Sequence, residues 1–391
     1  MAGDRPVLLT FAGHYLPGFK AGGPIRTLAN LVERLGDAFD VRIVTADRDL
    51  GDDRPFPGVT VDRWTALDGA RVYYRSPGAR AWERMLSTPE TRRPDVLYLN
   101  GFFGTHSSIL PLIERRRGRL YPSPVILAPR GEFAAAALGL KPLKKRAFIS
   151  AARWTGLHHR VTFQASSDHE AADIRRALGT VPICVAADLS GRSTLSGVSP
   201  PRRNPGDPFR LVLLARISPM KNLIGAIEII SRLGDLPIEL DIYGILEDAD
   251  YWCRCEAAIA ALPPNIRVAY KGPVQPEDVE TVLSGYDAFL LPTLGENYGH
   301  VIREALSAGL PVLISDRTPW RDLEARGAGA DLPLDDLDAF VRRIRDWATL
   351  SPERHEEMRR AARALGDDPV TAAAALEANR QMFLDALRQK T

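Results

Sequence analysis

The chain has 391 residues, of which 45% are hydrophobic and 26% are charged, and its formal net charge is +2. This length predicts two domains of about 190 residues each, and the weak charge argues against a nucleic-acid-binding protein. The cysteines Cys184, Cys253 and Cys255 are too few for a disulfide framework and lack metal-site spacing. No apolar run reaches the roughly 18 residues of a membrane-spanning helix. We therefore predict a soluble or peripheral protein of the reducing cytoplasm, in which Val7 to Ala12 is a first strand and not a signal peptide.

Apolar runs typical of buried strands alternate with helical patterns in the first half of the chain. The predicted strands are 7–11, 41–44, 96–99, 125–128, 161–164 and 181–185. Such alternation predicts a doubly wound parallel sheet, here a Rossmann-like domain over residues 1–190. Residues 191–208 are rich in Ser, Gly and Pro and are predicted to be an interdomain linker.

The first predicted strand runs into a glycine-rich turn that ends at Pro24. Glycine lets the backbone approach a ligand, and proline suits a first helical turn. The turn holds neither the dinucleotide fingerprint nor a Walker loop. It is either an ordinary strand-to-helix turn or a place where the adjacent Gly22 and Gly23 admit a ligand, and the twin glycines favour the second. His14, in the same turn, is a candidate acceptor-binding residue.

Two further loops follow predicted strands of the first domain. His106 lies at the end of one of them and either contacts a substrate or belongs to a helix cap. Arg130 and Glu132 lie on the other, and they either bind an acceptor or pair with each other.

Residues 141–160 form a basic segment without acidic residues. Leu143, Ala147, Ala151 and Trp154 fall on one stripe of a predicted helix. We expect this stripe to pack on the sheet of its own domain. The alternative is that the segment docks on an anionic membrane surface.

The second half of the chain repeats the alternating pattern. Its predicted strands are 210–214, 238–243, 266–271, 288–291 and 311–314. They predict a second Rossmann-like domain over residues 209–370, followed by a C-terminal helix, 371–391, that packs back on the first domain. Two such domains would face each other across a ligand-binding cleft.

Two cations follow the first strand of this second domain. Arg216 and Lys221 are five residues apart on a loop that leads through Asn222 into a helical run. Positive charge and free backbone N–H groups at a helix start suit a diphosphate. Alone the signal is weak, because surface cations are usually solvated.

The most informative segment contains Glu296 and Glu304, eight residues apart. Glu296 falls on a loop after a buried strand, and Glu304 about one turn into a helix that Gly299 opens. The two carboxylates are therefore expected to stand on the order of 10 Å apart. One can hold a sugar ring and the other a ribose.

With these residues, the chain resembles the family-four retaining glycosyltransferases of the GT-B fold, whose signature is Glu-x7-Glu in the second domain. The resemblance spans nearly the whole chain, through 18–24, 128–133 and 295–306, and is closest to members in polysaccharide and cell-surface glycan assembly. It implies that Glu296 contacts the donor sugar and Glu304 the ribose. Arg216 and Lys221 would neutralise the diphosphate. Further donor-binding residues implied by the resemblance are Gly22, Gly23, Asn297, Tyr298, Gly299 and His300. Tyr243, Gly244 and Val274 match the loops that hold the nucleotide base in such enzymes.

This sequence departs from the family pattern at two places. Pro129, Arg130 and Gly131 stand where many members have a histidine, so no role for that histidine carries over. Ala215 stands before Arg216, where glycine is common.

The resemblance implies transfer of a hexosyl unit from a UDP- or GDP-linked sugar to a hydroxyl of a glycan or lipid-linked acceptor, with retention. The leaving phosphate would take the acceptor proton, so neither a protein nucleophile nor a metal nor another cofactor is expected. The Asp-x-Asp segments 47–49, 248–250 and 336–338 are predicted to serve in caps and turns. A sugar-nucleotide epimerase and a non-catalytic nucleotide-sugar-binding protein stay open as alternatives. A nicotinamide dehydrogenase is disfavoured, because the glycine fingerprint is missing.

Overall fold

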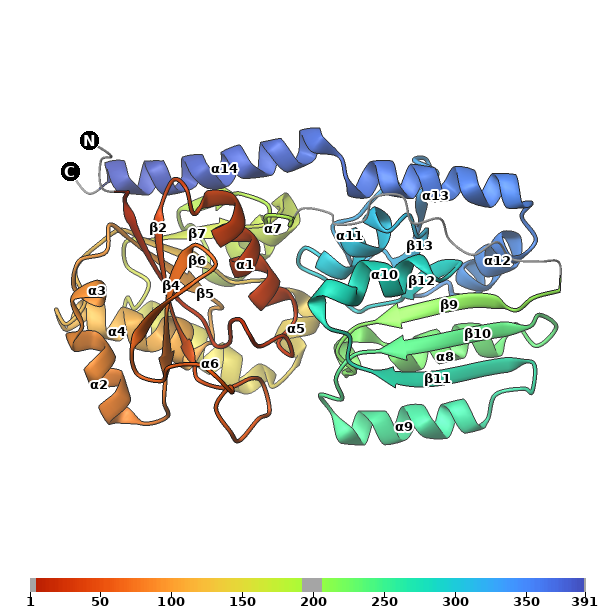
Figure 1. The fold of residues 1–391 in the computed structure, drawn as a ribbon, viewed down its shortest axis with the longest axis horizontal. Coiled ribbons are helices and arrows are strands. Elements are labelled where there is room, and N and C mark those ends of the chain that lie inside the picture. Colours follow the sequence, from red (N-terminus) through yellow and green to blue (C-terminus); the bar gives the residue numbers. More distant parts are fainter. Residues whose placement is uncertain (1–4, 192–205, 390–391) are drawn as a thin grey trace. The chain divides into compact units, whose positions relative to one another are not determined.

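The computed structural model describes residues 5–191 and 206–389, and the chain forms two compact units (Figure 1). Unit 1 comprises Met1–Gly191 and Val370–Thr391, and unit 2 comprises Arg192–Pro369. Most of the predicted linker, residues 192–205, lies outside the described residues. No helix in the described ranges is long and apolar enough to cross a bilayer.

Unit 1 is built on an eight-stranded sheet with the order β3-β4-β2-β1-β5-β6-β7-β8. All neighbouring strands are parallel except the β3–β4 pair. The strands are β1 (Val7–Phe11), β2 (Asp40–Ala46), β3 (Trp64–Leu67), β4 (Ala70–Arg75), β5 (Val96–Asn100), β6 (Val125–Ala128), β7 (Val161–Ala165) and β8 (Ile183–Val185). The predicted doubly wound sheet is confirmed, and the β3–β4 hairpin adds to it.

Helices cover both faces of this sheet. Successive residues of a strand point to opposite faces, so neighbouring apolar residues pack against different helices. Leu8 of β1 packs with α1 and α14, whereas Leu9 packs with α2, α4 and α7. The helices of unit 1 are α1 (Gly23–Leu35), α2 (Ala79–Ser87), α3 (Pro89–Arg92), the π-helical turn η1 (Thr105–Ile109), α4 (Leu110–Arg116), α5 (Ala135–Gly139), α6 (Pro142–Trp154), α7 (Asp168–Leu178) and α14 (Pro369–Arg388).

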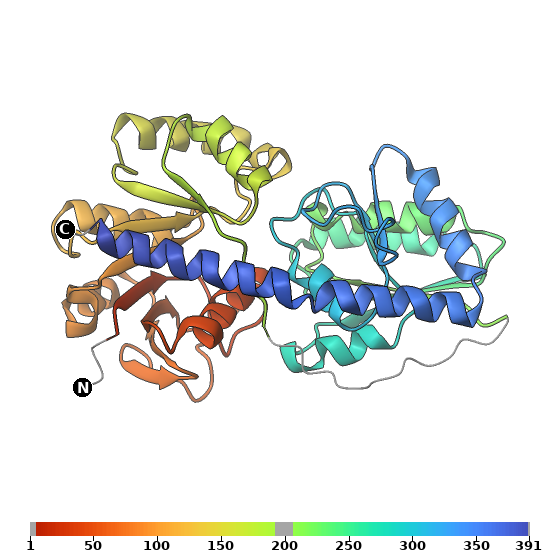
Figure 2. The ribbon, with the colours of Figure 1, turned by 90° about the horizontal axis from the view of Figure 1, so that it is seen from above.

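The C-terminal helix α14 lies along unit 1 (Figure 2). Phe383 meets the rings of Phe39 and Tyr98 edge-on, with centroids 5.5 and 5.3 Å away. Asn379 donates its side-chain amide to the carbonyl of Ala187 at 2.7 Å. These aromatic contacts and the buried hydrogen bond fix the end of the chain to the first sheet.

Unit 2 is built on a six-stranded parallel sheet with the order β11-β10-β9-β12-β13-β14. Its strands are β9 (Phe209–Leu214), β10 (Ile238–Tyr243), β11 (Ile266–Gly272), β12 (Ala288–Leu291), β13 (Val312–Ser315) and β14 (Gly329–Leu332). Its helices are η2 (Pro219–Lys221), α8 (Leu223–Ser231), α9 (Ala249–Ala260), η3 (Pro276–Asp278), α10 (Val279–Ser284), α11 (His300–Ser307), α12 (Leu337–Ala348) and α13 (Pro352–Gly366).

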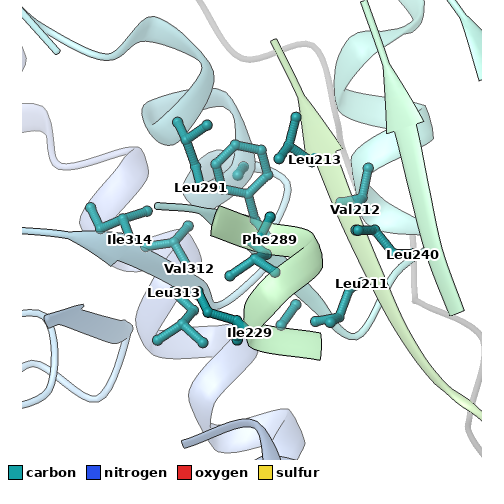
Figure 3. Packing of buried hydrophobic residues seen from close by; sticks show 14 of the residues in the cluster. Leu211, Val212, Leu213, Ile229, Leu240, Phe289, Leu291, Val312, Leu313 and Ile314 are labelled. Carbon is teal, nitrogen blue, oxygen red and sulfur yellow. The ribbon is translucent and has the colours of Figure 1, made fainter. Parts of the chain in front are cut away.

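The core of unit 2 lies around its central strands. Leu211 of β9, Phe289 of β12 and Val312 of β13 are fully buried together with Ile229 of α8 (Figure 3). The apolar runs that predict the strands are buried on both faces, as expected for a parallel sheet covered by helices.

Both sheets contain a point at which the strand order reverses direction. In unit 2 this switch point lies between β9 and β12, and in unit 1 between β1 and β5. In open α/β sheets, ligands bind beyond the carboxyl ends of the strands at such a point. The arrangement of the two domains across a cleft stays a prediction.

Candidate functional site

The loops that follow β9 and β12 are fastened to each other at the switch point of unit 2. The hydroxyl of Thr293 and the backbone N–H of Leu294 both donate to the carbonyl of Met220, at 3.0 and 2.9 Å. The side-chain amide of Asn222 donates to the carbonyl of Pro292 at 2.8 Å. Residues 70 or more positions apart in the sequence are thereby held in one place.

Lys221 and Glu296 form an ion pair at this junction, with the ammonium group donating to the carboxylate. Their side chains are only 15% and 11% exposed. The backbone N–H of Glu296 donates to the carbonyl of Arg317 at 3.0 Å, which fixes the loop from its other side. The pair is therefore largely shielded from solvent, unlike an exposed ion pair, which contributes little.

Asn222 supports this pair by turning the chain sharply into α8. Its backbone is left-handed, with φ of 54°, and its side chain accepts a hydrogen bond from the N–H of Gly225 at 3.3 Å. A Cβ atom on Gly225 would come within 2.4 Å of the Asn222 amide nitrogen. Asparagine tolerates this backbone conformation better than most residues, and its side chain caps the helix.

The helix α11 starts at Gly299, as the sequence predicts. Gly299 has φ of 78°, and a Cβ atom there would meet Ile302 at 2.9 Å. The indole N–H of Trp320 donates to the carbonyl of Tyr298 at 2.8 Å, and the Tyr298 ring packs against His300. Glu304 lies one turn into α11 and is half-buried, whereas Asn297 lies on the preceding loop.

Arg216 lies on the same loop as Lys221, but its ion-pair partner is a different carboxylate. Its guanidinium donates to Glu247 at 2.7 Å, and both side chains are about one-third exposed. The loops after β9 and β10 cross closely here. A Cβ atom on Gly244 would come within 1.8 Å of the Ala215 carbonyl oxygen. Only glycine therefore fits at this crossing.

The other residues expected around the nucleotide base are held within unit 2. The hydroxyl of Tyr243 lies 2.9 Å from the hydroxyl of Tyr286. The Tyr286 hydroxyl donates a hydrogen bond to the carboxylate of Asp241 at 2.8 Å. Burial, together with the hydrogen bonds to Tyr243 and Asp241, raises the pKa of Tyr286. Val274 packs half-buried against the core. Their predicted contacts with a base stay predictions.

In unit 1, the glycine-rich turn between β1 and α1 is held by Asp49. One carboxylate oxygen of Asp49 accepts the backbone N–H groups of Phe19 and Lys20 at 2.8 and 3.1 Å. Gly22, the residue before α1, has φ of 66° and open space where a Cβ atom would project. Gly23 is the first residue of α1.

Arg130 lies at the carboxyl ends of the strands of unit 1 and is fully engaged inside it. It pairs with the buried Asp188 and donates to the side chains of Asn100 at 2.9 Å and Tyr98 at 2.5 Å. Asn100 in turn donates to the hydroxyl of Thr10 at 3.0 Å. This network joins β1, β5 and the loop after β6 at the switch point.

Glu132 accepts the backbone N–H groups of Phe102 and Phe103, the latter at 3.0 Å. Burial raises the pKa of Glu132, and these N–H groups oppose that effect. The interpretation in which Arg130 and Glu132 pair with each other is wrong, since each has other partners. Their predicted contact with an acceptor stays a prediction.

The two candidate histidines of unit 1 lie on different loops. His106 lies in η1, and its ring centroid is 5.9 Å from that of Trp82. Burial lowers the pKa of His106, and the positive charge of Arg75 adds to this effect. His14 places its Nδ1 atom 3.2 Å from the carbonyl oxygen of Arg48.

The Asp-x-Asp segments serve as caps and turns, as predicted. Asp248 accepts the N–H of Tyr251 at the start of α9, and Asp336 accepts that of Ala339 at the start of α12, both at 2.9 Å. Asp49 holds the glycine-rich turn. Within the described ranges, no group of three or more His, Cys, Asp or Glu residues could hold a metal ion.

Residues 199–365 match the model of the family Glycosyl transferases group 1. This match falls within unit 2 and contains Lys221, Glu296 and the other residues of its switch point. No protein with a curated description matches the chain significantly. Unit 2 is thus similar to the group 1 glycosyltransferases.

Solved glycosyltransferase structures share the fold of the whole chain. Sucrose-phosphate synthase from Thermosynechococcus elongatus aligns with a TM-score of 0.71 and 16% identity, over 98% of this chain and 100% of that one. HepE from Anabaena, in complex with UDP-glucose, aligns with a TM-score of 0.67 and 14% identity, over 98% and 99%. WaaG, a glycosyltransferase involved in lipopolysaccharide biosynthesis, aligns with a TM-score of 0.59 and 14% identity, over 95% and 98%. The predicted two-domain α/β fold of the GT-B type is confirmed.

Several residues that shape the site of unit 2 were not singled out from the sequence. Thr293, Trp320 and Arg317 fix the loop that carries Glu296, and they act through partners distant in sequence. No local signal marks such residues. Asn222 had a signal, since an asparagine directly before a helical run predicts a cap.

Proposed function

We propose that the protein is a retaining glycosyltransferase that moves a hexosyl unit from a UDP- or GDP-linked sugar to a hydroxyl of a glycan or lipid-linked acceptor, in polysaccharide or cell-surface glycan biosynthesis. The observation that carries this proposal is the Lys221–Glu296 pair at the switch point of unit 2. It lies within the region similar to group 1 glycosyltransferases. The HepE structures, which contain UDP-glucose or UDP and glucose, support a UDP-linked donor as the first to test.

In the proposed reaction, the bond between the anomeric carbon and the diphosphate breaks. Positive charge develops on the sugar ring, while the diphosphate leaves with negative charge. Lys221 and Arg216 would stabilise the diphosphate, an effect typically worth about 3 kcal/mol for each well-placed donor. Each cation already has a carboxylate partner. A guanidinium has five N–H donors and an ammonium three, so each can bind a phosphate oxygen as well.

The carboxylates of Glu296 and Glu304 would have different roles. Glu296 is held by Lys221 and by the Arg317 carbonyl, which suits a group that contacts the donor sugar in one fixed orientation. Glu304, one turn into α11, would bind the ribose hydroxyls.

Retention follows in this proposal from transfer on a single face of the sugar. The acceptor oxygen forms a bond to the anomeric carbon on the face that the diphosphate leaves, and the acceptor proton passes to the leaving phosphate oxygen. No protein nucleophile is required, and metal independence is part of the same proposal. We place the reaction in the cytoplasm, where the free thiols of the three cysteines would stay reduced.

Thermal unfolding in the presence of UDP- and GDP-linked hexoses tests the proposal. A donor at a hundred times its dissociation constant is expected to add about 2.7 kcal/mol of stability. The stabilising donor is then incubated with hydroxyl acceptors, and the anomeric configuration of the product is determined by NMR. A product with inverted configuration, or no stabilisation by any of these donors, would contradict the proposal.

The same assay separates the alternatives. An epimerase would convert the donor alone into an isomer. A non-catalytic binder would be stabilised by the donor and would release no nucleotide with any acceptor.

A further inference from the structure

The helix α6 turns an apolar stripe toward solvent. Leu143 and Trp154 are 80% and 89% exposed, and Leu140, just before the helix, is 51% exposed. The sequence-based expectation that Leu143, Ala147, Ala151 and Trp154 pack on the sheet is therefore wrong. The helix packs instead through residues on its other side, namely Phe148, Ile149 and Ala152.

The same exposed surface is strongly basic. Lys141, Lys144, Arg146 and Arg153 are exposed, and within the described ranges none of them forms an ion pair. No acidic residue occurs between positions 133 and 167. Elsewhere many arginines on the surface pair with carboxylates, as Arg232 does with Asp338. Cations without carboxylate partners beside exposed apolar side chains suit a partner that supplies both anions and an apolar phase.

The geometry of α6 suits a flat partner. Leu143 and Trp154 are eleven residues apart, which is about 16 Å along a helix and about three turns. Both side chains therefore project from the same side of the helix, with the cations beside them. A helix that connects parallel strands runs back from their carboxyl ends to their amino ends. The Leu143 end of α6 accordingly starts near the edge of the sheet where Arg130 follows β6.

We propose that α6 docks on an anionic lipid bilayer. Leu143 and Trp154 enter the boundary between headgroups and acyl chains, and the four cations bind lipid phosphates. A second copy of the chain would place like charges against each other, so it does not fit this surface. This proposal does not depend on the transferase activity, because it rests only on the surface of unit 1.

Co-sedimentation of the full chain with vesicles tests the charge requirement. Binding is expected to phosphatidylcholine vesicles that contain phosphatidylglycerol, but not to phosphatidylcholine alone, and to weaken with salt. Lys144→Glu combined with Arg153→Glu is expected to lower partitioning about tenfold or more. The matched control is Arg267→Glu with Arg354→Glu, which makes the same charge change at exposed positions of unit 2 and should bind nearly as the wild type does.

A second pair of variants tests the apolar contact. Leu143→Ser with Trp154→Ser is expected to lower partitioning by about tenfold or more. Leu246→Ser with Val370→Ser removes exposed apolar side chains elsewhere and should have little effect. Because Leu143 and Trp154 are mostly exposed, the melting temperature of their double variant should match that of the wild type.

Tryptophan fluorescence distinguishes insertion from adsorption. Brominated lipid should quench part of the emission of the wild type, and Trp154→Phe should abolish this quenching while it retains vesicle binding. The proposal is overturned if anionic vesicles do not bind the protein, if the variants and their controls lose binding equally, or if quenching persists in Trp154→Phe. Donor binding in solution would be unaffected by any of these results, so failure here is distinct from failure of the proposed transferase function.

Discussion

The switch points of the two sheets have the same topology but use their polar residues differently. In unit 1, Arg130, Asp188 and Asn100 are bonded to one another inside the protein. In unit 2, Lys221 and Glu296 lie on two loops, bonded to each other and partly accessible to solvent. Strand order places polar groups at this edge in both units. Hydrogen bonds to the strands of its own sheet make the first group a scaffold, whereas the second group joins two loops beyond the strands, where a ligand can reach it.

The largest effect that this comparison predicts is in unit 1. Arg130→Met leaves Asp188 as a buried carboxylate without its ion-pair partner, so unfolding in urea should show a loss of about 3–5 kcal/mol. The control Arg232→Met removes two exposed ion pairs and should have a much smaller effect on stability. Equal losses in the two variants would show that the Arg130 network is not a scaffold.

A second prediction concerns the pH dependence of unit 1. His158 stacks on Phe102, and its Nε2 atom is buried without a hydrogen-bond partner. Burial lowers the pKa of His158 from 6.5 to about 4. Above pH 6.5 the imidazole is neutral in both the folded and the unfolded state. As the pH falls from 6.5 to 4, the imidazole is protonated in the unfolded state but not in the folded state, so the free energy of unfolding decreases.

The loss amounts to about 3 kcal/mol, since one pKa unit corresponds to about 1.4 kcal/mol. His158→Phe should remove this part of the pH dependence in urea unfolding while it preserves the stacked ring. A wild type whose stability is unchanged across this range would contradict the account.

A smaller effect is expected at the glycine-rich turn. Asp49→Asn weakens two hydrogen bonds from backbone N–H groups to a charged oxygen, and should cost about 1–3 kcal/mol of stability. If this turn admits the donor, the KM for the nucleotide sugar should also rise. Asp52→Asn is the matched control, because the Asp52 carboxylate is exposed and pairs with the ammonium group of Lys20. A rise in KM with Asp52→Asn and none with Asp49→Asn would refute the role of the turn.

Much of the fold could be predicted from the sequence, because strands buried on both faces appear as apolar runs. The hairpin of β3 and β4 was missed, although Asp68 and Gly69, with φ of 45° and 89°, form a two-residue turn of a favoured type. The edge strand β14 was missed because its sequence, Gly-Ala-Asp-Leu, has no run of large apolar residues.

The site was predictable to a lesser degree. Spacing placed Glu296 on its loop and Glu304 in its helix, but the partners of Lys221 and Arg216 depend on contacts between distant loops. The stripe on α6 shows the same limit. Helical periodicity identifies residues that share a side, yet only the tertiary structure shows which side faces the sheet.

The central claim is that the Lys221–Glu296 pair acts on the donor sugar, and the transfer rate of Glu296→Gln tests it most directly. The substitution keeps the shape of the side chain and removes its charge, so kcat/KM should fall at least tenfold, or by about 1.4 kcal/mol, with the melting temperature nearly unchanged. Glu324→Gln, which alters an exposed ion pair with Arg343 in the same unit, should retain full activity. A Glu296→Gln protein that keeps more than about a tenth of the wild-type kcat/KM would contradict the claim.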